Sequence, residues 1–402
     1  MGCSFIVIVI VLRTLAPAPF MASQNAIFDA MQRIAPRPYV EAPVRVIDID
    51  DESLQRIGQW PWSRDVLATL TERLTAFGAA SIAFDFVFSE PDRTSPSTLM
   101  KKWATMPGFP AVSAATQELP DYDRRFAEAI ASSPVVLSIA LVGSEGRGAP
   151  ATKAGFALVG ADPTRTVAQF PGAITNLPEL EDAAKGVGSF SITGEDGETI
   201  RRIPLLARYG DQIVPSLALE ALRVAQGADT IGVRRESEAS LRLRVGDVMV
   251  PADADAGMRM HFTAPVAGRT IPAWQVLSVD HRSQVEDRIA GHIVLVGTSA
   301  AGLSDLRATA VNPFDSGMNI HAQAIEQILL GAHLVRPTWF AGAEVAAAVA
   351  LAVGLIFICA FQGVGLSLSA LAAVVTTVLA AAWYGYADHH LLGDPTTVCV
   401  AA

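Results

Sequence analysis

The stretch that decides the fold is residues 44–92, VRVIDIDDESLQRIGQWPWSRDVLATLTERLTAFGAASIAFDFVFSEPD. Two segments inside it, Val44–Ile49 and Ile82–Phe88, are apolar and rich in β-branched or aromatic residues, which is typical of buried strands. Between them, Arg64–Phe77 repeats apolar residues at helical spacing, and Gly78 follows as a stop signal. Strand, helix and strand at this spacing predict a βαβ unit with a right-handed crossover.

The entry to the predicted helix is specified by its first residues. Ser63 is placed to cap the helix N-terminus, and Asp65 puts negative charge in the first turn. Pro61 restricts Trp60 to an extended conformation and so fixes the approach to the helix. Trp60 and Trp62 are expected to pack at this entry.

The rest of residues 92–331 alternates predicted strands and helices, which favours an α/β domain with a mixed, largely parallel sheet. Residues 92–120 and 143–163 are expected to form an excursion and a flexible loop. An Asp-Gly turn is expected at 196–197 and a β-hairpin at 242–250. The further predicted elements are helices at Tyr122–Ala131, Val214–Arg223 and Ile320–Leu330, and strands at Pro134–Val142, Ile203–Arg208 and Ile293–Val296.

Several motifs follow one another along the chain. They are VIDID at 46–50, GQWPWSR at 58–64, FDFVFSE at 84–90, DGETIRRIPL at 196–205, GHIVLVGT at 291–298 and NIHAQAI at 319–325. In this order they resemble the second type of CHASE domain, a sensory module found outside the membrane in bacterial receptors. The resemblance covers most of residues 38–337.

Composition separates a membrane part from a charged part of the chain. Of the 402 residues, 51% are hydrophobic and only 17% are charged. Between Thr338 and Ala387, Glu344 is the single charged residue, and Val345–Phe361 and Val364–Ala387 are each long enough to cross a bilayer. Gln362-Gly363 joins them, which predicts a tight hairpin of transmembrane helices.

Charge and cysteine content exclude several classes of function. The net charge of −10, without a basic stripe, argues against a nucleic-acid partner. Cys3, Cys359 and Cys399 all lie in apolar segments, so the long region between the first two of them has no disulfide or cysteine-based zinc site. We expect no cofactor and no metal site in this chain.

Four parts are expected along the chain. Residues 1–29 form a membrane anchor or signal segment, 30–337 a sensor domain, 338–387 two transmembrane helices, and 388–402 the start of a third, truncated helix. The resemblance implies a multi-pass protein of the bacterial inner membrane, with the sensor domain in the periplasm. The topology rests on the resemblance, because loop charges do not set the orientation.

The resemblance also implies a role in signalling. In the family, the helices after the sensor lead to a cytoplasmic effector, most often a class III adenylate or guanylate cyclase and sometimes a histidine or Ser/Thr kinase. No residue of such an effector is present, so this chain is expected to have no catalytic residue of its own. Class III cyclases work as dimers, which makes a homodimer the expected state.

Acidic residues lie at or near the ends of two predicted strands that are expected to be neighbours, and they are the first candidate for a ligand site. Asp48, Asp50 and Asp85 could converge on a cation, an amine or a hydroxyl-bearing ligand, because ligands bind beyond the carboxyl ends of strands in α/β sheets. The equally weighted alternative is structural: Asp50 or Asp51 would cap a short helix, and Asp85 would pair with Arg64.

The segment GTSAAGLS at 297–304 is the second candidate. It nearly matches a phosphate loop, but Leu303 stands where that motif needs lysine, which leaves at most a weak anion site formed by backbone N–H groups. Ser299, Asp305 and His321 also follow the chain order of a hydrolase triad, although their spacing is too compact for one. A strand-to-helix turn and a hydrogen-bonded core histidine are the simpler interpretation.

The candidate ligand-binding residues are therefore Asp48, Asp50, Arg64, Asp85, Ser299 and Asp305. Two other classes of protein stay open. One is an extracytoplasmic serine hydrolase that uses Ser299. The other is a transport or structural membrane component, which the lack of charges inside the predicted spans disfavours.

Overall fold

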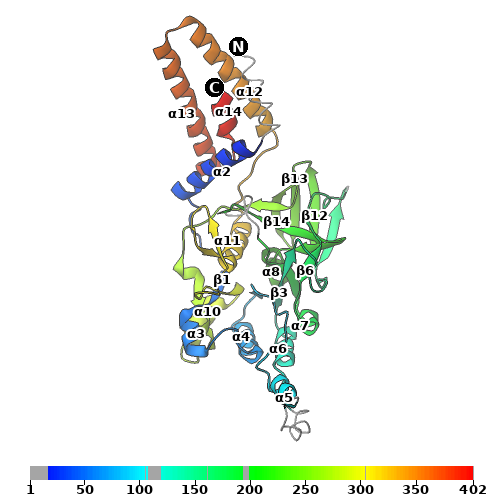
Figure 1. Ribbon diagram of the computed structural model, residues 1–402. Coiled ribbons are helices and arrows are strands. Elements are labelled where there is room, and N and C mark those ends of the chain that lie inside the picture. Colours follow the sequence, from blue (N-terminus) through cyan, green and yellow to red (C-terminus); the bar gives the residue numbers. More distant parts are fainter. Residues whose placement is uncertain are drawn as a thin grey trace. The chain divides into compact units, whose positions relative to one another are not determined.

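The computed structural model describes residues 17–104, 106, 119–160, 162–192, 199–303 and 305–401 (Figure 1). The chain divides into two compact units. The α/β unit consists of residues 39–260 and 265–331, and the helical unit of residues 1–38, 261–264 and 332–402. The expected turn at Asp196-Gly197 and the first half of the expected N-terminal anchor lie outside the described residues.

The main sheet of the α/β unit has seven strands and confirms the predicted fold class. All of its strand pairs are parallel except the pair of β3 and β6. The order is β16 (Thr270–Pro272), β1 (Val44–Ile49), β17 (Ile293–Thr298), β2 (Ser81–Phe84), β3 (Val135–Val142) and β6 (Gly172–Ile174), and β7 (Gly186–Ser189) also pairs with β3.

Four smaller sheets complete the strands of this unit. The first consists of β11 (Gln212–Pro215), β10 (Leu206–Tyr209) and β5 (Gln169–Phe170), and the second of β14 (Val248–Asp253), β13 (Ser240–Val245), β12 (Thr230–Ser237) and β4 (Gly155–Val159). The third pairs β15 (Gly257–Arg259) with β9 (Arg202–Pro204). The fourth consists of β19 (Asp315–Ser316), β18 (Leu306–Thr309) and β8 (Thr199–Ile200).

Its helices are mostly short. They are α3 (Asp51–Ile57), α4 (Arg64–Ala76), α5 (Pro96–Ala104), α6 (Tyr122–Ala131), α7 (Pro178–Ala183), α8 (Leu217–Ala225), the 3₁₀ turn η2 (Ala267–Arg269), α9 (Ala273–Leu277), α10 (Arg282–Ile289) and α11 (Gly317–Leu329).

The predicted helix of the opening segment forms as its sequence specifies. Helix α4 begins at Arg64, and the Ser63 hydroxyl accepts a hydrogen bond from the Val66 N–H at 3.5 Å. Trp62 is buried and its Nε1 donates to the Gly58 carbonyl. The Trp60–Pro61 peptide bond is cis, which the sequence analysis did not predict.

The strands of that segment depart from the prediction in two ways. Strand β17 lies between β1 and β2, so the two predicted strands are not neighbours. Strand β2 ends at Phe84 rather than Phe88, because the chain leaves the sheet and packs its aromatic rings together. The ring centroids of Phe86 and Phe88 lie 5.3 Å apart, and that of Phe88 lies 5.2 Å from Phe126.

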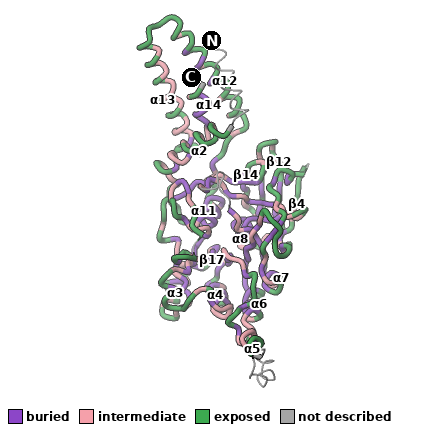
Figure 2. Tube along the Cα trace, viewed as in Figure 1, coloured by how far each residue is buried: buried purple, intermediate pink, exposed green. Residues whose placement is uncertain are grey.

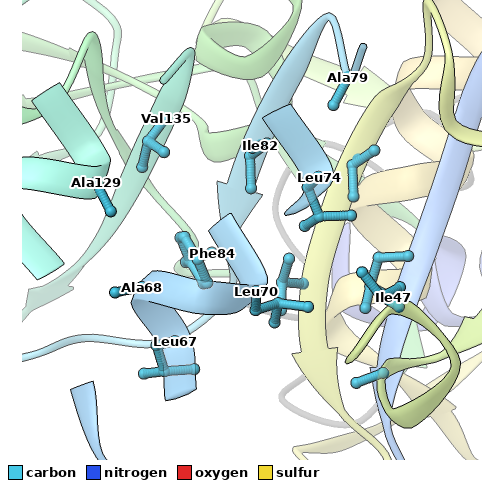
Figure 3. Packing of buried hydrophobic residues seen from close by; sticks show 14 of the residues in the cluster. Ile47, Leu67, Ala68, Leu70, Leu74, Ala79, Ile82, Phe84, Ala129 and Val135 are labelled. Atoms are coloured by element: carbon cyan, nitrogen blue, oxygen red, sulfur yellow. The ribbon is translucent and has the colours of Figure 1, made fainter. Parts of the chain in front are cut away.

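One face of the main sheet carries an extensive apolar core. The apolar stripe of α4 packs there against Ile47, Ile82 and Phe84, and α6 and α9 extend the same cluster (Figure 3). Leu67, Leu70 and Leu74 are fully buried in it. Removing one of these leucine side chains would cost about 2–5 kcal/mol in unfolding free energy.

Helices α8 and α11 cover the other face. Helix α11 contacts β1 and β17, and it approaches β17 so closely that only glycine fits at position 297. A Cβ atom built on Gly297 would lie 2.6 Å from Met318 Sδ and 2.9 Å from Met318 Cβ. Gly297 therefore sets the distance between α11 and the sheet.

A buried ion pair fixes α11 further along its length. Arg269 Nε and Nη2 donate to the two carboxylate oxygens of Glu326, at 2.6 and 2.9 Å, and both side chains are 1% exposed. Arg269 Nη1 also donates to Asn319 Oδ1 at 2.9 Å. A shift of α11 that separated the two side chains would leave both charges buried without a partner, which is costly. The pair therefore holds α11 in one register against the edge of the sheet.

Other sequence expectations hold in part. The helix at Tyr122–Ala131 and the hairpin at 242–250 are confirmed, the latter as β13 and β14 with Gly246 at φ +54° in the turn. The expected flexible loop at 143–163 contains the exposed edge strand β4, and the excursion at 92–120 contains α5. The expected strand at 203–208 spans parts of β9 and β10, and Val214 belongs to β11 rather than to the following helix.

The helical unit contains α2 (Pro17–Ile34), α12 (Phe340–Phe361), α13 (Val364–His389) and α14 (Pro395–Ala401). Helices α12 and α13 form the predicted hairpin, and both are long and apolar enough to cross a membrane. Their sides are largely exposed (Figure 2), as expected of surfaces that lipid would cover.

Polar side chains meet at one end of this hairpin. Glu344, the charged residue of the predicted spans, pairs with Arg336 at 2.5 Å and accepts a hydrogen bond from the Asp394 N–H at 2.7 Å. Asp394 in turn accepts from Gln24 of α2 at 2.6 Å. Glu344 is thus part of a local network that joins the helix ends, which does not resemble a substrate pathway.

Candidate functional site

The carboxyl ends of β1, β17 and β2 bring two predicted site residues to the same face of the sheet. Asp48 pairs in register with Gly297, and Asp85 directly follows β2, where its N–H donates to the Val296 carbonyl. The two carboxylates therefore lie on either side of Gly297, on the face that α11 covers. Together with Ser299 and Asp305 they form what we call the acidic edge.

The side chain of Asp48 on β1 is hydrogen-bonded to Ser299, which follows the neighbouring strand β17. Asp48 Oδ1 accepts from the Ser299 N–H at 2.9 Å, and Asp48 Oδ2 accepts from the Ser299 hydroxyl at 2.6 Å. Burial raises the pKa of Asp48, and the two bonds from Ser299 partly offset this effect. The carboxylates of Asp50 and Asp51 add a smaller upward shift in the pKa of Asp48.

The loop after β17 is already occupied by carboxylates of this chain. Besides the Ser299 N–H, the Ala301 N–H donates to Asp51 Oδ1 at 3.1 Å. These are the backbone groups that a bound phosphate would need, and two carboxylates beside them repel an anion. These contacts disfavour an anion at the described part of this loop, and the weak anion site stays a prediction.

Asp85 is the most strongly perturbed group of the acidic edge. Its Oδ1 atom is buried and accepts no hydrogen bond from the residues that the structure describes. Its Oδ2 atom lies beside the first residue of α11, since a Cβ built on Gly317 would be 3.3 Å from it. Burial raises the pKa of Asp85 well above its ordinary value, and the charge of Asp305 raises it further.

Asp305 lies at the solvent side of this group. Its carboxylate pairs with Arg307 at 2.9 Å, and its carbonyl accepts from the Gly317 N–H at 3.3 Å. Asp305 and Asp85 thus both border the N-terminus of α11. The positive end of the helix dipole favours a nearby anion by only about 0.3–1 kcal/mol, which is less than the cost of a buried carboxylate without a partner.

Two of the predicted site residues are used elsewhere. Asp50 caps α3 by accepting from the Ser53 N–H at 2.7 Å, as the structural alternative proposed. The predicted pair of Arg64 with Asp85 is wrong, because Arg64 lies 3.4 Å from Asp123 and 4.4 Å from the ring of Phe88.

The surroundings of Arg64 form a separate polar cluster at the start of α4. Asp92 accepts a hydrogen bond from the Arg64 backbone N–H at 2.7 Å, and Asp123 accepts one from the Asp92 N–H. Burial lowers the pKa of Arg64 and raises that of Asp123. The sequence analysis missed Asp92 and Asp123; the position of Asp123 in the first turn of a predicted helix was the only signal for it.

The residues of the hydrolase alternative do not assemble. The Ser299 hydroxyl donates to Asp48, whereas His321 Nε2 lies 3.3 Å from the Phe190 carbonyl. His321 is buried, and its burial lowers its pKa to about 4. It is the hydrogen-bonded core histidine that the simpler interpretation expected, and within the described residues Ser299 makes no hydrogen bond to a histidine.

The described part of the chain contains no cluster of three or more histidine, cysteine, aspartate or glutamate side chains arranged to hold a metal ion. The acidic edge offers the carboxylates of Asp48, Asp85 and Asp305 and the hydroxyl of Ser299, and these three carboxylates are not arranged to hold one metal ion. This chemistry suits a protonated amine or a hydroxyl-bearing ligand, or a proton itself, better than a metal ion.

The family model of the CHASE2 domain matches residues 4–360 of the chain. The chain belongs to the CHASE2 family. CHASE2 is an extracytoplasmic sensor domain of signalling proteins, so the resemblance seen in the motifs is confirmed over most of the chain. No significant match was found among curated proteins or among solved structures.

We predict that Asp85→Asn changes how stability depends on pH. The pKa of Asp85 is higher in the folded than in the unfolded chain, so the folded chain holds its proton more tightly, and stability falls as pH rises from about 4 through the folded pKa. The amide side chain of the variant does not ionise. At pH 7.5 the variant should be more stable by about 1–3 kcal/mol, and the difference should shrink toward pH 4.5.

Thermal unfolding of both proteins in the same detergent across this pH range measures the effect. Asp305→Asn is the matched control: it removes the smaller cause of the raised pKa and should give a smaller change in the same direction. If the stability difference between the wild-type protein and Asp85→Asn is the same at pH 4.5 and at pH 7.5, the raised pKa assigned to Asp85 is contradicted.

Proposed function

We propose that this CHASE2 chain is the sensor of a membrane-anchored receptor and that its acidic edge responds to the signal. The signal is a change in the occupancy or protonation of Asp48 and Asp85. The observation that carries this proposal is the position of Asp85 at the N-terminus of α11, where one buried carboxylate oxygen accepts no hydrogen bond from the residues that the structure describes.

Helix α11 connects this edge to the membrane helices along the chain. It ends at Leu329, and α12 begins at Phe340, so only a short segment joins the two in sequence. A change in the charge of Asp85 alters the energy of the first turn of α11. A shift of this helix is the conformational step that we propose for signal transfer.

The effector that we propose is a cytoplasmic class III adenylate or guanylate cyclase, with a histidine or Ser/Thr kinase as the second candidate. This choice rests on family resemblance. The same resemblance supports a homodimer, because class III cyclases build their active sites between two copies.

The proposal predicts that Asp48→Asn and Asp85→Asn change signalling output without unfolding the protein. The full gene product, expressed in bacteria that lack their own cyclases, should show cyclic nucleotide levels shifted at least about threefold in either variant, because each removes a charge from the acidic edge. Asp280→Asn, an exposed aspartate outside the edge, is the matched control.

Wild-type levels in both edge variants would remove the acidic edge from the mechanism. A gene product without any cyclase activity, but with autophosphorylation that responds to the same substitutions, would favour the kinase.

The placement of the α/β unit outside the cytoplasm predicts the outcome of reporter fusions within residues 122–142. A fused alkaline phosphatase, which needs an oxidising compartment, should be active, and a fused green fluorescent protein exported by the general secretion route should be dark. A fusion beyond α13 serves as a second position for comparison. Fluorescence with inactive phosphatase at 122–142 would place the unit in the cytoplasm and contradict the receptor proposal.

A further inference from the structure

A cavity of about 190 Å³ lies in the α/β unit, away from the acidic edge. Its walls come from the end of β3, from the small sheet of β10 and β11, and from the pair of β9 and β15. Leu141, Ile203, Leu206 and Val214 supply buried apolar surface. An engineered apolar cavity of about 150 Å³ binds benzene, so this volume fits a ligand of about ten non-hydrogen atoms.

Two serine hydroxyls supply the polar part of the wall. Ser189 and Ser216 are neighbours across a β-bridge, and both line the cavity. The Ser189 hydroxyl accepts from the Ser191 N–H at 3.2 Å, and the Ser216 hydroxyl accepts from the Leu219 N–H at 3.2 Å. Neither hydroxyl donates a hydrogen bond to any residue within the described ranges, so both can donate to a ligand.

The charges at the mouth of the cavity select against anions. Arg202 lines the cavity, but its Nη2 atom pairs with Asp253 at 2.8 Å and with Asp255 at 2.6 Å. One guanidinium against two carboxylates leaves this rim negative. A carboxylate or phosphate ligand would therefore meet repulsion rather than a free cation.

We propose that this cavity is a binding site for a small uncharged aromatic or alicyclic compound that carries a carbonyl or ether oxygen. The apolar body fills the cavity between β3, β10 and β11, and the oxygen accepts a hydrogen bond from Ser189 or Ser216. The site deepens the sensor function proposed above by giving the α/β unit a second input, chemically distinct from the acidic edge.

Acetophenone is the probe, because it combines an aromatic ring with one carbonyl acceptor. Binding to the 402-residue chain in lipid nanodiscs is followed by saturation-transfer NMR, with empty nanodiscs to subtract partition into lipid. We expect saturable binding with a Kd of roughly 0.1–1 mM. Benzoate, which has nearly the same shape but a negative charge, should bind at least about tenfold more weakly.

Two substitutions test the location of the site. Ala207→Leu places three further carbons in the cavity and should abolish saturable binding, whereas Ala151→Leu makes the same change in the adjacent core, outside the cavity walls. Ala207→Val is a smaller filling substitution, to be used if the leucine variant does not fold. Ser189→Ala should weaken the binding of acetophenone by about threefold to tenfold. It should leave the binding of ethylbenzene unchanged, because ethylbenzene has no hydrogen-bond acceptor.

Binding that is no greater than in empty nanodiscs, or that survives in both Ala207 variants, would overturn the site. Benzoate binding as tight as acetophenone would overturn the assigned ligand class. The assay involves no effector, so its failure leaves the receptor proposal standing, and failure of the signalling assay leaves the binding site standing.

Discussion

Helix α11 is held against the main sheet by two contacts that leave it little freedom. Met318 packs onto β17 where only glycine fits, and the Arg269–Glu326 ion pair fixes the helix nearer its C-terminal end. Core packing of this kind shifts between discrete arrangements rather than deforming gradually. A disturbance at one end of α11 therefore acts on the whole helix.

The acidic edge lies at the end of the helix where such a disturbance would begin. Asp85 lies against the first turn of α11. Burial of its charged carboxylate costs free energy, and protonation of Asp85, or a bound amine or hydroxyl-bearing ligand, would reduce that cost. Asp48, in contrast, is satisfied by two bonds from Ser299. The two carboxylates thus differ: Asp48 also fixes the loop after β17, and Asp85 is the group whose state changes more readily.

Local elements were predictable from the sequence because their signals are local. The capped and amphipathic helix α4, the helix α6 and the apolar hairpin of α12 and α13 each form within a few residues of the expected limits. Motif order alone led to the CHASE2 family. Asp48 and Ser299 could also be named as candidate site residues from the sequence, because each lies at or just after the end of a predicted strand.

Long-range arrangement could not be predicted in this way. Nothing in the local pattern shows that β17, more than two hundred residues later in the chain, inserts between β1 and β2. The predicted ion-pair partner of Arg64 was wrong for the same reason, because the true partner, Asp123, belongs to another helix. Strand β4 was missed because its short apolar run lies inside the glycine-, alanine- and proline-rich segment 143–163 and stays largely exposed at the edge of its sheet. The cavity beside β10 exists only through the packing of separate sheets.

Hydrogen–deuterium exchange tests the link between Asp85 and α11 most directly. At pH 7.5, peptides covering residues 317–329 are compared between the wild-type chain and Asp85→Asn in nanodiscs, with peptides of α4 as the internal reference. The account predicts that exchange in α11 slows at least about fivefold more than exchange in α4, because relief of the buried charge stabilises the helix that borders it. Equal changes in α11 and α4, or no change in α11, would contradict it.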